Sequence, residues 1–339
     1  MLLEYKTASA IHRYTDAERH CACGYYSNRT WFNEDLVVLS RSQNIEDFCG
    51  CELICVDFRT GDEYLLAEKC SDFNDYIVVG EYLYYITDSE LWRVRIDGTG
   101  REYIYRCENM TFPHATNDGR YLNWQVSGHP DKCMILDLQT GRAEEAFSKG
   151  FEKPFATADH MMICPTDPNK VFFAHEGITF YVSNRLWLWE REKGMRCIAK
   201  QRLDEDGNLG DCFGHECWNA DGEGIYFVKY SCSPLPPSGI CYTDTCGNQT
   251  DVLYGKYPYW HVCASPDGRF LAADTQSGDY SGVCLIDTVS GNETMISKAG
   301  YTWVHPSHPH PQFSPSGKKL IWNSIENGKL GVEVFEVTT

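Results

Sequence analysis

The chain has 339 residues, 42% of them hydrophobic, so it is long enough to bury one or more substantial cores. Its formal net charge of −18 argues against a nucleic-acid-binding protein, which needs a basic surface, and against docking on an anionic membrane. No stretch approaches the roughly 18 consecutive apolar residues of a membrane span.

The 17 cysteines bear on the cellular compartment. Their number is odd, they are scattered along the chain, and residues 1–14 (MLLEYKTASAIHRY) lack the apolar region of a secretory signal. We therefore predict free thiols and a cytoplasmic protein. The CxC pairs Cys21/Cys23 and Cys49/Cys51 leave a zinc site open as an alternative, although no second pair stands at zinc-finger spacing.

Strand and turn signals recur along the chain. The early segments ELICVDFRTGD (52–62) and ELWRVRIDGTG (90–100) each predict a strand closed by a glycine turn. A polar turn followed by an alternating strand predicts a hairpin, and it appears in TNDGRYLNW (116–124), PTDPNKVFFA (165–174), NADGEGIYFV (219–228), SPDGRFLAAD (265–274) and SPSGKKLIWN (314–323). Second strands with a closing turn follow in CMILDLQTGR (133–142), RLWLWEREKG (185–194) and GVCLIDTVSGN (282–292).

These units give seven repeats that begin near residues 25, 71, 111, 158, 213, 259 and 308. Repeats of this size bury their faces by stacking on their neighbours, and ring closure removes exposed strand edges. We therefore predict an all-β fold, a seven-bladed β-propeller in which residues 1–339 form a single domain of four-stranded blades. A double β-sandwich is the structural alternative.

Histidines recur at one position of the repeat. His215, His261 and His310 each precede the third residue of a hairpin turn by six positions, and His160 precedes its turn by seven. Equivalent positions in successive blades are related by rotation about the axis, so we expect these side chains to converge on the central channel. Core packing explains such a cluster poorly, because an unpaired polar group is costly to bury.

The segment YTWVHPSHPHPQFSPSG (301–317) adds further histidines. Its prolines forbid a helix, and residues two apart in an extended chain face the same side. His308 and His310 therefore point the same way, and His305 lies nearby. The pattern predicts a divalent metal site, with a hydrated polar channel as the alternative.

Four blocks of sequence closely resemble the oligogalacturonate lyase family. They are HMMICPTDPNKVFFAHEG (160–177), SNRLWLW (183–189), GHECWNADG (214–222) and HPHPQFSPSG (308–317), and their order and spacing match the family over residues 110–339. The resemblance implies a seven-bladed propeller with a central manganese ion. It also implies cleavage of short pectin fragments by β-elimination inside the cell, with a 4-deoxy-5-keto uronic acid among the products.

The resemblance also implies roles for individual residues. The family's metal ligands fall on His261, His308 and His310, and the position of its fourth ligand, a glutamine, is His305 in this sequence. An imidazole in place of an amide oxygen leaves Zn²⁺, Ni²⁺ or Fe²⁺ open beside Mn²⁺.

The family's proton-abstracting base falls on His215 and its substrate-binding arginine on Arg185. His175, in the shared HEG block, is a candidate pocket residue. Two alternatives stay open: His215 as a further ligand or a donor to one, and Arg185 as the ion-pair partner of Glu176 or Glu190.

The expected partner is a small anionic oligosaccharide, and the oligomeric state cannot be deduced from the sequence. Two other functions stay open at this point. One is a lyase for another uronic-acid disaccharide, such as a rhamnose–uronate unit. The other is a non-catalytic propeller that binds proteins, although a scaffold has no need for clustered histidines.

Overall fold

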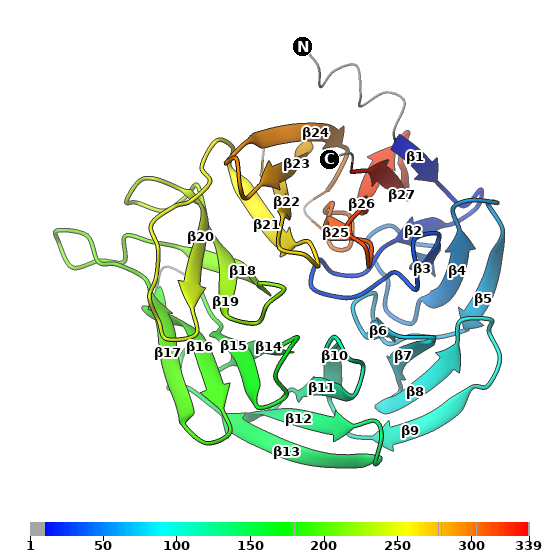
Figure 1. The fold of residues 1–339 in the computed structure, drawn as a ribbon, viewed down its shortest axis with the longest axis horizontal. Helices are drawn as coiled ribbons and strands as arrows, with labels where there is room; N and C mark the ends of the chain where they lie inside the picture. The colour runs from blue at the N-terminus through cyan, green and yellow to red at the C-terminus, as the bar shows by residue number, and fades with distance from the viewer. Residues whose placement is uncertain (1–10, 179–180, 277, 279, 303, 338–339) are drawn as a thin grey trace. The chain divides into compact units, whose positions relative to one another are not determined.

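The computed structural model describes residues 11–178, 181–276, 278, 280–302 and 304–337. In these residues the chain forms 27 strands arranged in seven antiparallel sheets (Figure 1). The sheets are the blades of a seven-bladed β-propeller, which confirms the predicted all-β fold class. Among these residues there is no helix with the length and apolar character needed to cross a membrane.

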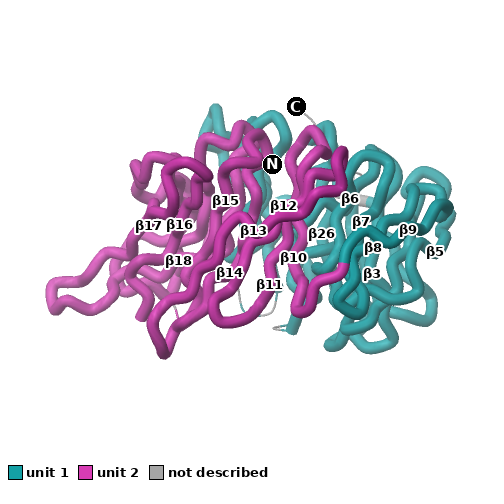
Figure 2. The backbone as a smooth tube through the Cα atoms, turned by 90° about the horizontal axis from the view of Figure 1, so that it is seen from below, with its two compact units in different colours: residues 1–105, 260–339 teal, residues 106–259 magenta. Residues whose placement is uncertain are grey.

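The sheets are divided between two compact units (Figure 2). Unit 1 comprises residues 1–105 and 260–339, and unit 2 comprises residues 106–259. Unit 1 contains four sheets, apart from one end residue each of β9 and β21, which lie in unit 2. In hydrogen-bonded order, the first two sheets are β2 (His20–Ala22), β3 (Leu36–Ser42), β4 (Glu52–Asp57) and β5 (Glu63–Ala67), and then β6 (Tyr76–Val79), β7 (Tyr82–Thr87), β8 (Glu90–Arg95) and β9 (Glu102–Arg106). The other two are β21 (Tyr259–Ala264), β22 (Phe270–Thr275), β23 (Ser281–Asp287) and β24 (Glu293–Ala299), and then β1 (Ile11–Tyr14), β27 (Lys329–Glu336), β26 (Lys319–Glu326) and β25 (Gln312–Phe313).

Unit 2 contains the other three sheets. They are β10 (Met110–Ala115), β11 (Tyr121–Val126), β12 (Asp131–Asp137) and β13 (Arg142–Lys149); β14 (Ala158–Ile163), β15 (Lys170–His175), β16 (Asn184–Glu190) and β17 (Gly194–Lys200); and β18 (Phe213–Trp218), β19 (Gly224–Lys229) and β20 (Gly239–Asp244).

Both ends of the described chain meet in one sheet of unit 1. β1 pairs antiparallel with β27, and Arg13 stands opposite Glu333. The Arg13 side chain binds the Glu333 carboxylate at 3.0 Å and donates to the carbonyl oxygens of Ser324 and Lys329 at 3.0 and 3.2 Å. The N-terminal strand therefore completes the sheet that carries β25 and β26.

Alternation along each strand builds two hydrophobic faces. In β15, Phe172 packs in one core with Phe213 of β18, whereas Phe173 packs in another with Cys133 of β12. Successive side chains of a strand point to opposite faces, so this sheet packs against both other sheets of unit 2.

Three of the closing turns of the repeat share one hydrogen-bonding pattern. In the turn after β12, the Gly141 N–H donates to the Asp137 carbonyl oxygen at 2.8 Å, and the Asp137 carboxylate accepts two following N–H groups. Gly141 has φ of 69°, a left-handed conformation that glycine adopts without steric cost. The same aspartate-to-glycine bond closes the turns at Asp57/Gly61 and Asp287/Gly291.

The first strands of three sheets carry the same irregularity. The pairings β10–β11, β14–β15 and β18–β19 each shift register at their middle. Phe112, His160 and His215 lie at these shifts with φ of 60°, 55° and 52°. A bulge re-aims the side chain it carries, so the repeat places His160 and His215 in equivalent local geometry. His310, just before β25, also has a positive φ, of 46°.

One sheet departs from the predicted four strands. Among the described residues, the sheet of β18, β19 and β20 has three. The segment that follows β20 forms isolated bridges, Gln249 with Thr243 and Tyr254 with Ile240. The Thr250 hydroxyl bonds the backbone N–H and carbonyl of Tyr242, and this side-chain contact competes with regular strand pairing.

Candidate metal centre and catalytic residues

His261 is fully buried in β21 and is oriented by a carboxylate on the neighbouring strand. Asp274 of β22 accepts the His261 backbone N–H at 2.8 Å, and its two oxygens lie 2.8 and 3.0 Å from His261 Nδ1. An imidazole whose Nδ1–H donates to a carboxylate presents the lone pair of Nε2, an arrangement common among metal-binding histidines.

The HPH segment, residues 308–310, is held by the two strands beside it. Asn323 of β26 donates from Nδ2 to the carbonyl oxygens of Pro306 and of the first residue of the segment at 2.8 and 3.1 Å. The backbone N–H of His310 donates to Asp274 at 3.2 Å. Prolines lack an N–H, so this segment is fixed largely through its carbonyl oxygens.

These contacts bring three imidazoles together. The donor atoms of His261, His308 and His310 lie within 4.8 Å of one another, and all three residues are buried. In the described part of the chain, this is the group of histidine, cysteine and acidic side chains that could hold a metal ion. Three convergent imidazole nitrogens, one with its tautomer fixed by Asp274, fit a divalent transition metal.

His305 lies at the edge of this cluster. Its ring centroid is 4.6 Å from that of His308 and 5.1 Å from that of His310. Part of the residue is exposed, although its ring lies near those of Tyr25 and Phe73, and it does not join the three close donors. Gln312, which follows the HPH segment, donates to the carbonyl oxygens of Gly24 and Tyr25.

Burial sets the charge state of the cluster. It lowers the pKa of His308 to about 4, with the His305 imidazole as a further cause, and it lowers the pKa of His305 as well. Both rings are thus neutral at pH 7, the form that binds a metal. Burial raises the pKa of Asp274 to about 7, although the N–H groups of His261 and His310 favour its charged form. A nearby cation would favour the carboxylate further.

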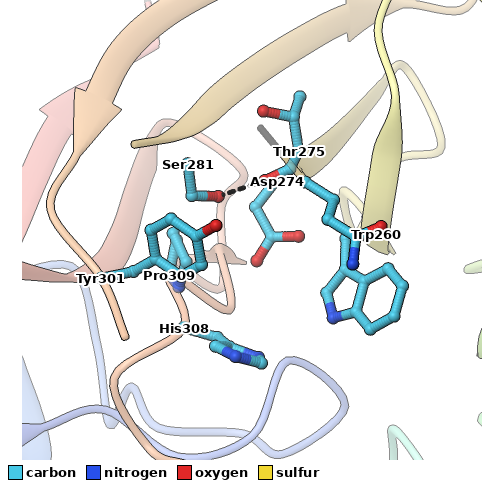
Figure 3. A pocket seen from close by; sticks show the side chains of 8 residues that line it. Trp260, Asp274, Thr275, Ser281, Tyr301, His308 and Pro309 are labelled. Atoms are coloured by element: carbon cyan, nitrogen blue, oxygen red, sulfur yellow. Dashed lines mark hydrogen bonds between the residues drawn. The ribbon is translucent and has the colours of Figure 1, made fainter. Parts of the chain in front are cut away.

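Aromatic rings enclose the histidines of unit 1. The Tyr25 ring lies 4.8 Å from that of His310, the Tyr26 ring lies 5.0 Å from that of His261, and Phe73 is nearly parallel to His310 at 6.2 Å. On another side a small pocket adjoins His308 and the Asp274 carboxylate and is also lined by Trp260 and Tyr301 (Figure 3). The apolar walls limit the water around the imidazoles.

The candidate base, His215, lies in β18 of unit 2. Its Nδ1 is 2.9 Å from the hydroxyl of Tyr230. If Nδ1 carries the proton and donates it to Tyr230, Nε2 carries the lone pair and is the nitrogen that would accept a proton. Tyr230 thus orients the ring of His215, the residue that the sequence predicted as the base.

Arg185 is buried in β16 within a chain of charges. It donates from Nη1 to the carbonyl oxygen of His175 at 2.8 Å and pairs through Nη2 with Glu176. Its Nε lies 3.8 Å from Glu216, which is fully buried. The ion pair with Glu176, one of the alternatives from the sequence, is therefore present, whereas Glu190 binds Lys193 and Arg196.

Glu216 also pairs with His160, at 3.3 Å from Nδ1. Burial alone would lower the pKa of His160, but the hydrogen bond to Glu216 and the negative charges of Asp159, Glu176 and Glu216 together outweigh it, and the pKa rises to about 9. Burial opposes the charge of Glu216, but His160 and Arg185 outweigh it and lower the pKa of Glu216 to about 2. The pair is therefore charged at pH 7.

The side chain of His175 is engaged by its surroundings. Its ring stacks on Phe151 with centroids 3.6 Å apart, and Nε2 lies 2.7 Å from the carbonyl oxygen of Phe155. This half-buried ring thus packs on the segment before β14, while its carbonyl oxygen supports Arg185.

Three residues of these clusters were not identified from the sequence: Asp274, Glu216 and Tyr230. Two of them carry a signal in hindsight, because a carboxylate in a strand of otherwise apolar residues must be paired when it is buried. Asp274 ends the apolar run FLAAD, and Glu216 lies inside GHECW. Tyr230 follows β19 with no such signal.

Comparisons with known proteins identify proteins that are similar to this chain. No family model matches the chain. Over 225 residues the chain is 24% identical to an oligogalacturonate lyase of Dickeya dadantii (strain 3937), a match that covers 61% of this chain and 55% of the relative. The chain thus spans about half the length of the curated relatives it matches.

Two solved structures share the fold across nearly the whole chain. An oligogalacturonate lyase in complex with manganese aligns with a TM-score of 0.79 at 19% identity, covering 97% of this chain and 96% of that one. An oligogalacturonate lyase from Vibrio parahaemolyticus aligns with a TM-score of 0.77 at 17% identity and the same coverage.

The fold and the histidine cluster together define a seven-bladed β-propeller with the side chains to hold a metal ion. The sequence match shows which known proteins this propeller resembles. The chain is related to the oligogalacturonate lyases, which confirms the resemblance seen in its motifs.

Proposed function

We propose that the protein is a metal-dependent lyase that cleaves short oligogalacturonides, such as digalacturonate and its unsaturated form, by β-elimination. The observation that carries this proposal is the buried group of His261, His308 and His310 with the Asp274 carboxylate behind it. The relatives named oligogalacturonate lyase support the reaction class, and the one in complex with manganese supports Mn²⁺ as the first candidate ion.

In this proposal His261, His308, His310 and His305 hold the ion. Neutral imidazoles contribute no negative charge, so the ion keeps its full positive charge. A bound divalent ion would stabilise the negative charge that develops on a uronate as it loses its C5 proton. His305 stands where the family has a glutamine, so Zn²⁺, Ni²⁺ and Fe²⁺ belong in the same test.

His215 is the proposed base. Its Nε2 takes the C5 proton, the electrons of that C–H bond form the C4=C5 double bond, and the C4–O bond breaks with its electrons going to the leaving oxygen. A positioned base contributes roughly 10²–10⁴-fold to such a step. Tyr230, at 2.9 Å from Nδ1, holds the ring and its tautomer.

Arg185 is the proposed substrate-binding residue, through the bidentate fork that guanidinium offers to a carboxylate. Its Nη2 pairs with Glu176, whose side chain is 25% exposed, so a substrate carboxylate would compete with Glu176 for it. His175 supports this arginine through its carbonyl oxygen and is kept as a proposed pocket residue.

The test is a product assay on the purified chain. Saturated and unsaturated digalacturonate are incubated with added Mn²⁺, Zn²⁺, Ni²⁺ or Fe²⁺, or with EDTA, and the keto-uronate product is measured. We expect product with at least one metal and none with EDTA. No product with any ion, while metal is still bound, would reject the substrate and point to another uronide.

Single variants separate the roles. His308→Ala should lose metal and activity together, whereas His215→Ala should keep the metal and lose at least about 100-fold in turnover. His12→Ala, at an exposed position of β1, is the control and should match the wild type in both readouts. Stoichiometric metal in His308→Ala would exclude that residue as a ligand, and normal turnover in His215→Ala would exclude it as the base.

A cytoplasmic location is part of the same proposal. All 17 cysteines are free thiols, which suits a reducing compartment. Within the described residues, the CxC pairs do not form a group that could hold a metal. Thiol titration of freshly prepared, unfolded protein without reductant should find all the cysteines reactive, whereas disulfides would contradict the location.

A further inference from the structure

A second cavity lies beside the three-stranded sheet of unit 2. Where a regular fourth strand would pair with β20, the segment of residues 249–254 makes isolated bridges instead. Beside it is a cavity of about 240 Å³. The residues of its lining that carry charge are Lys200, Arg202, Asp211, Lys229 and Asp251, and none of them belongs to the histidine cluster or to the network of Arg185.

The charges of this cavity do not cancel. Asp211 is fully buried, and its carboxylate accepts Nε, Nη2 and the backbone N–H of Arg202 at 2.9–3.0 Å. It also lies 2.6 Å from Nζ of Lys229. Burial opposes its charge, but these partners outweigh it and lower the pKa of Asp211. With three cationic and two anionic side chains in the lining, one positive charge is left over.

Lys229 is the buried side chain of this cavity that has fewer acceptors than its ammonium group can use. Its side chain is 3% exposed, although an ammonium group has three donors and is costly to bury without partners. Asp211 is its one ion-pair partner among the described residues, and Asp211 already serves Arg202. An anionic oxygen in the cavity would supply the missing acceptor and neutralise the remaining charge.

We propose that this cavity binds a small carboxylate of sugar-acid size, with the carboxylate on Lys229 and hydroxyl groups toward Gln249. The side-chain oxygen of Gln249 accepts the backbone N–H of Lys200, so its amide N–H groups remain to donate to hydroxyls. One net positive charge matches a monoanion. The cavity and its charge do not depend on the lyase activity, whereas galacturonate as the probe rests on the proposed function.

The experiment is a calorimetric titration of galacturonate into the EDTA-treated full chain. We expect one saturable site, weakened at least about tenfold in Lys229→Met, because truncating one member of a buried charge pair removes the main contact. Galactose, which has the same size without the charge, should not bind. His308→Ala should bind galacturonate like the wild type, which separates this site from the histidine cluster and from turnover.

Two further variants protect the test from misfolding. Lys193→Met removes an exposed cation outside the cavity and should leave the affinity unchanged. Asp251→Asn removes an exposed anion of the cavity and should tighten binding about threefold by reducing repulsion. Equal affinity in Lys229→Met and the wild type would overturn the proposal. So would equal binding of galactose, preference for inorganic phosphate, or loss of binding in His308→Ala alone.

Discussion

The carboxylate of Asp274 organises two of the three clustered histidines at once. It accepts the backbone N–H groups of His261 and His310 and faces the ring nitrogen of His261. A single fully buried side chain therefore fixes one imidazole and the backbone that carries another. Its negative charge would also favour a cation among the rings, so its contribution has a geometric part and an electrostatic part.

Asp274→Asn should lower the affinity for Mn²⁺ about 10- to 100-fold, because the asparagine keeps the shape but loses the charge and one acceptor. Titration of metal into the apo protein measures this effect. Asp287→Asn is a matched control in the same sheet, because Asp287 pairs with Arg269, which is 45% exposed. Equal metal affinity in wild type and Asp274→Asn would show that this carboxylate does not support a metal ligand.

The pair of His160 and Glu216 should make stability depend on pH. The pKa of His160 is raised to about 9, so its contribution is complete below about pH 6.5 and is lost as the pH rises through about 9. The pKa of Glu216 is lowered to about 2, so its contribution is complete above about pH 4.5 and is lost as the pH falls toward 2. The pair therefore contributes most between about pH 4.5 and 6.5.

His160→Asn should destabilise the protein by about 3 kcal/mol near pH 6, since it removes the charged partner at 3.3 Å from the buried Glu216 carboxylate. Asparagine tolerates the positive φ of this position better than most residues. Urea unfolding at about pH 6 and pH 9.5 measures the difference, which should shrink at the higher pH. His129→Asn, at an exposed position, should leave the free energy of unfolding unchanged at both pH values. A penalty that is constant with pH would contradict the ion pair.

Strand β18 positions His215 through a close contact that depends on glycine. A Cβ atom added at Gly214 would lie 2.0 Å from the Tyr230 hydroxyl, so Tyr230 would have to move. That movement would break the 2.9 Å contact with His215 Nδ1. The absence of a side chain at Gly214 thus lets the tyrosine reach the histidine.

If His215 is the base, Gly214→Ala should lower kcat about 100-fold with little change in KM or metal affinity, because a misplaced base loses rate rather than binding. Tyr230→Phe, which removes the hydroxyl alone, should also lower kcat. Gly128→Ala is the control, since its nearest contact would be 3.4 Å away. A wild-type kcat in Gly214→Ala would show that Tyr230 does not position the base.

The turns and strands were predictable because their signals are local. The bond from Asp137 to Gly141 and its equivalents lie within five residues, so the repeat, and with it the seven-bladed fold, could be deduced from the sequence. The three-stranded sheet was not predicted, because it depends on how the Thr250 hydroxyl competes for the backbone of Tyr242. Local patterns do not show which of two hydrogen-bonding partners a strand edge takes.

The histidines of the candidate site could be predicted from the sequence, whereas the carboxylates that hydrogen-bond to histidines could not. His261, His308 and His310 were singled out by repeat position and spacing, and the structure brings their donor atoms within 4.8 Å. Asp274 and Glu216 act through partners on other strands, 13 and 56 residues away along the chain. Such pairings depend on strand register, which single-residue patterns do not encode.

The chain as a whole carries a net charge of −18, which attracts cations weakly and without a specific site. A specific centre must therefore be distinguished from this background. Salt does so, because at about 0.15 M it screens exposed charges beyond roughly 8 Å, whereas coordination by three buried imidazoles is little affected. The division into two compact units offers a second distinction, since the clustered histidines all belong to unit 1.

Mn²⁺ at about 100 times its Kd should stabilise the state that binds it by about 2.7 kcal/mol, because unfolded chain lacks the site. In about 0.15 M salt, amide hydrogen exchange should slow in β21, which contains His261, in β25, which follows the HPH segment, and in β26, whose Asn323 bonds that segment. His308→Ala should show no such protection, while Lys193→Met, a control in unit 2, should respond like the wild type. Slower exchange in every variant would mean that the ion binds the acidic surface and not the imidazoles. Protection confined to the elements around His261 and His310, and lost in His308→Ala, would locate the ion without reference to any substrate.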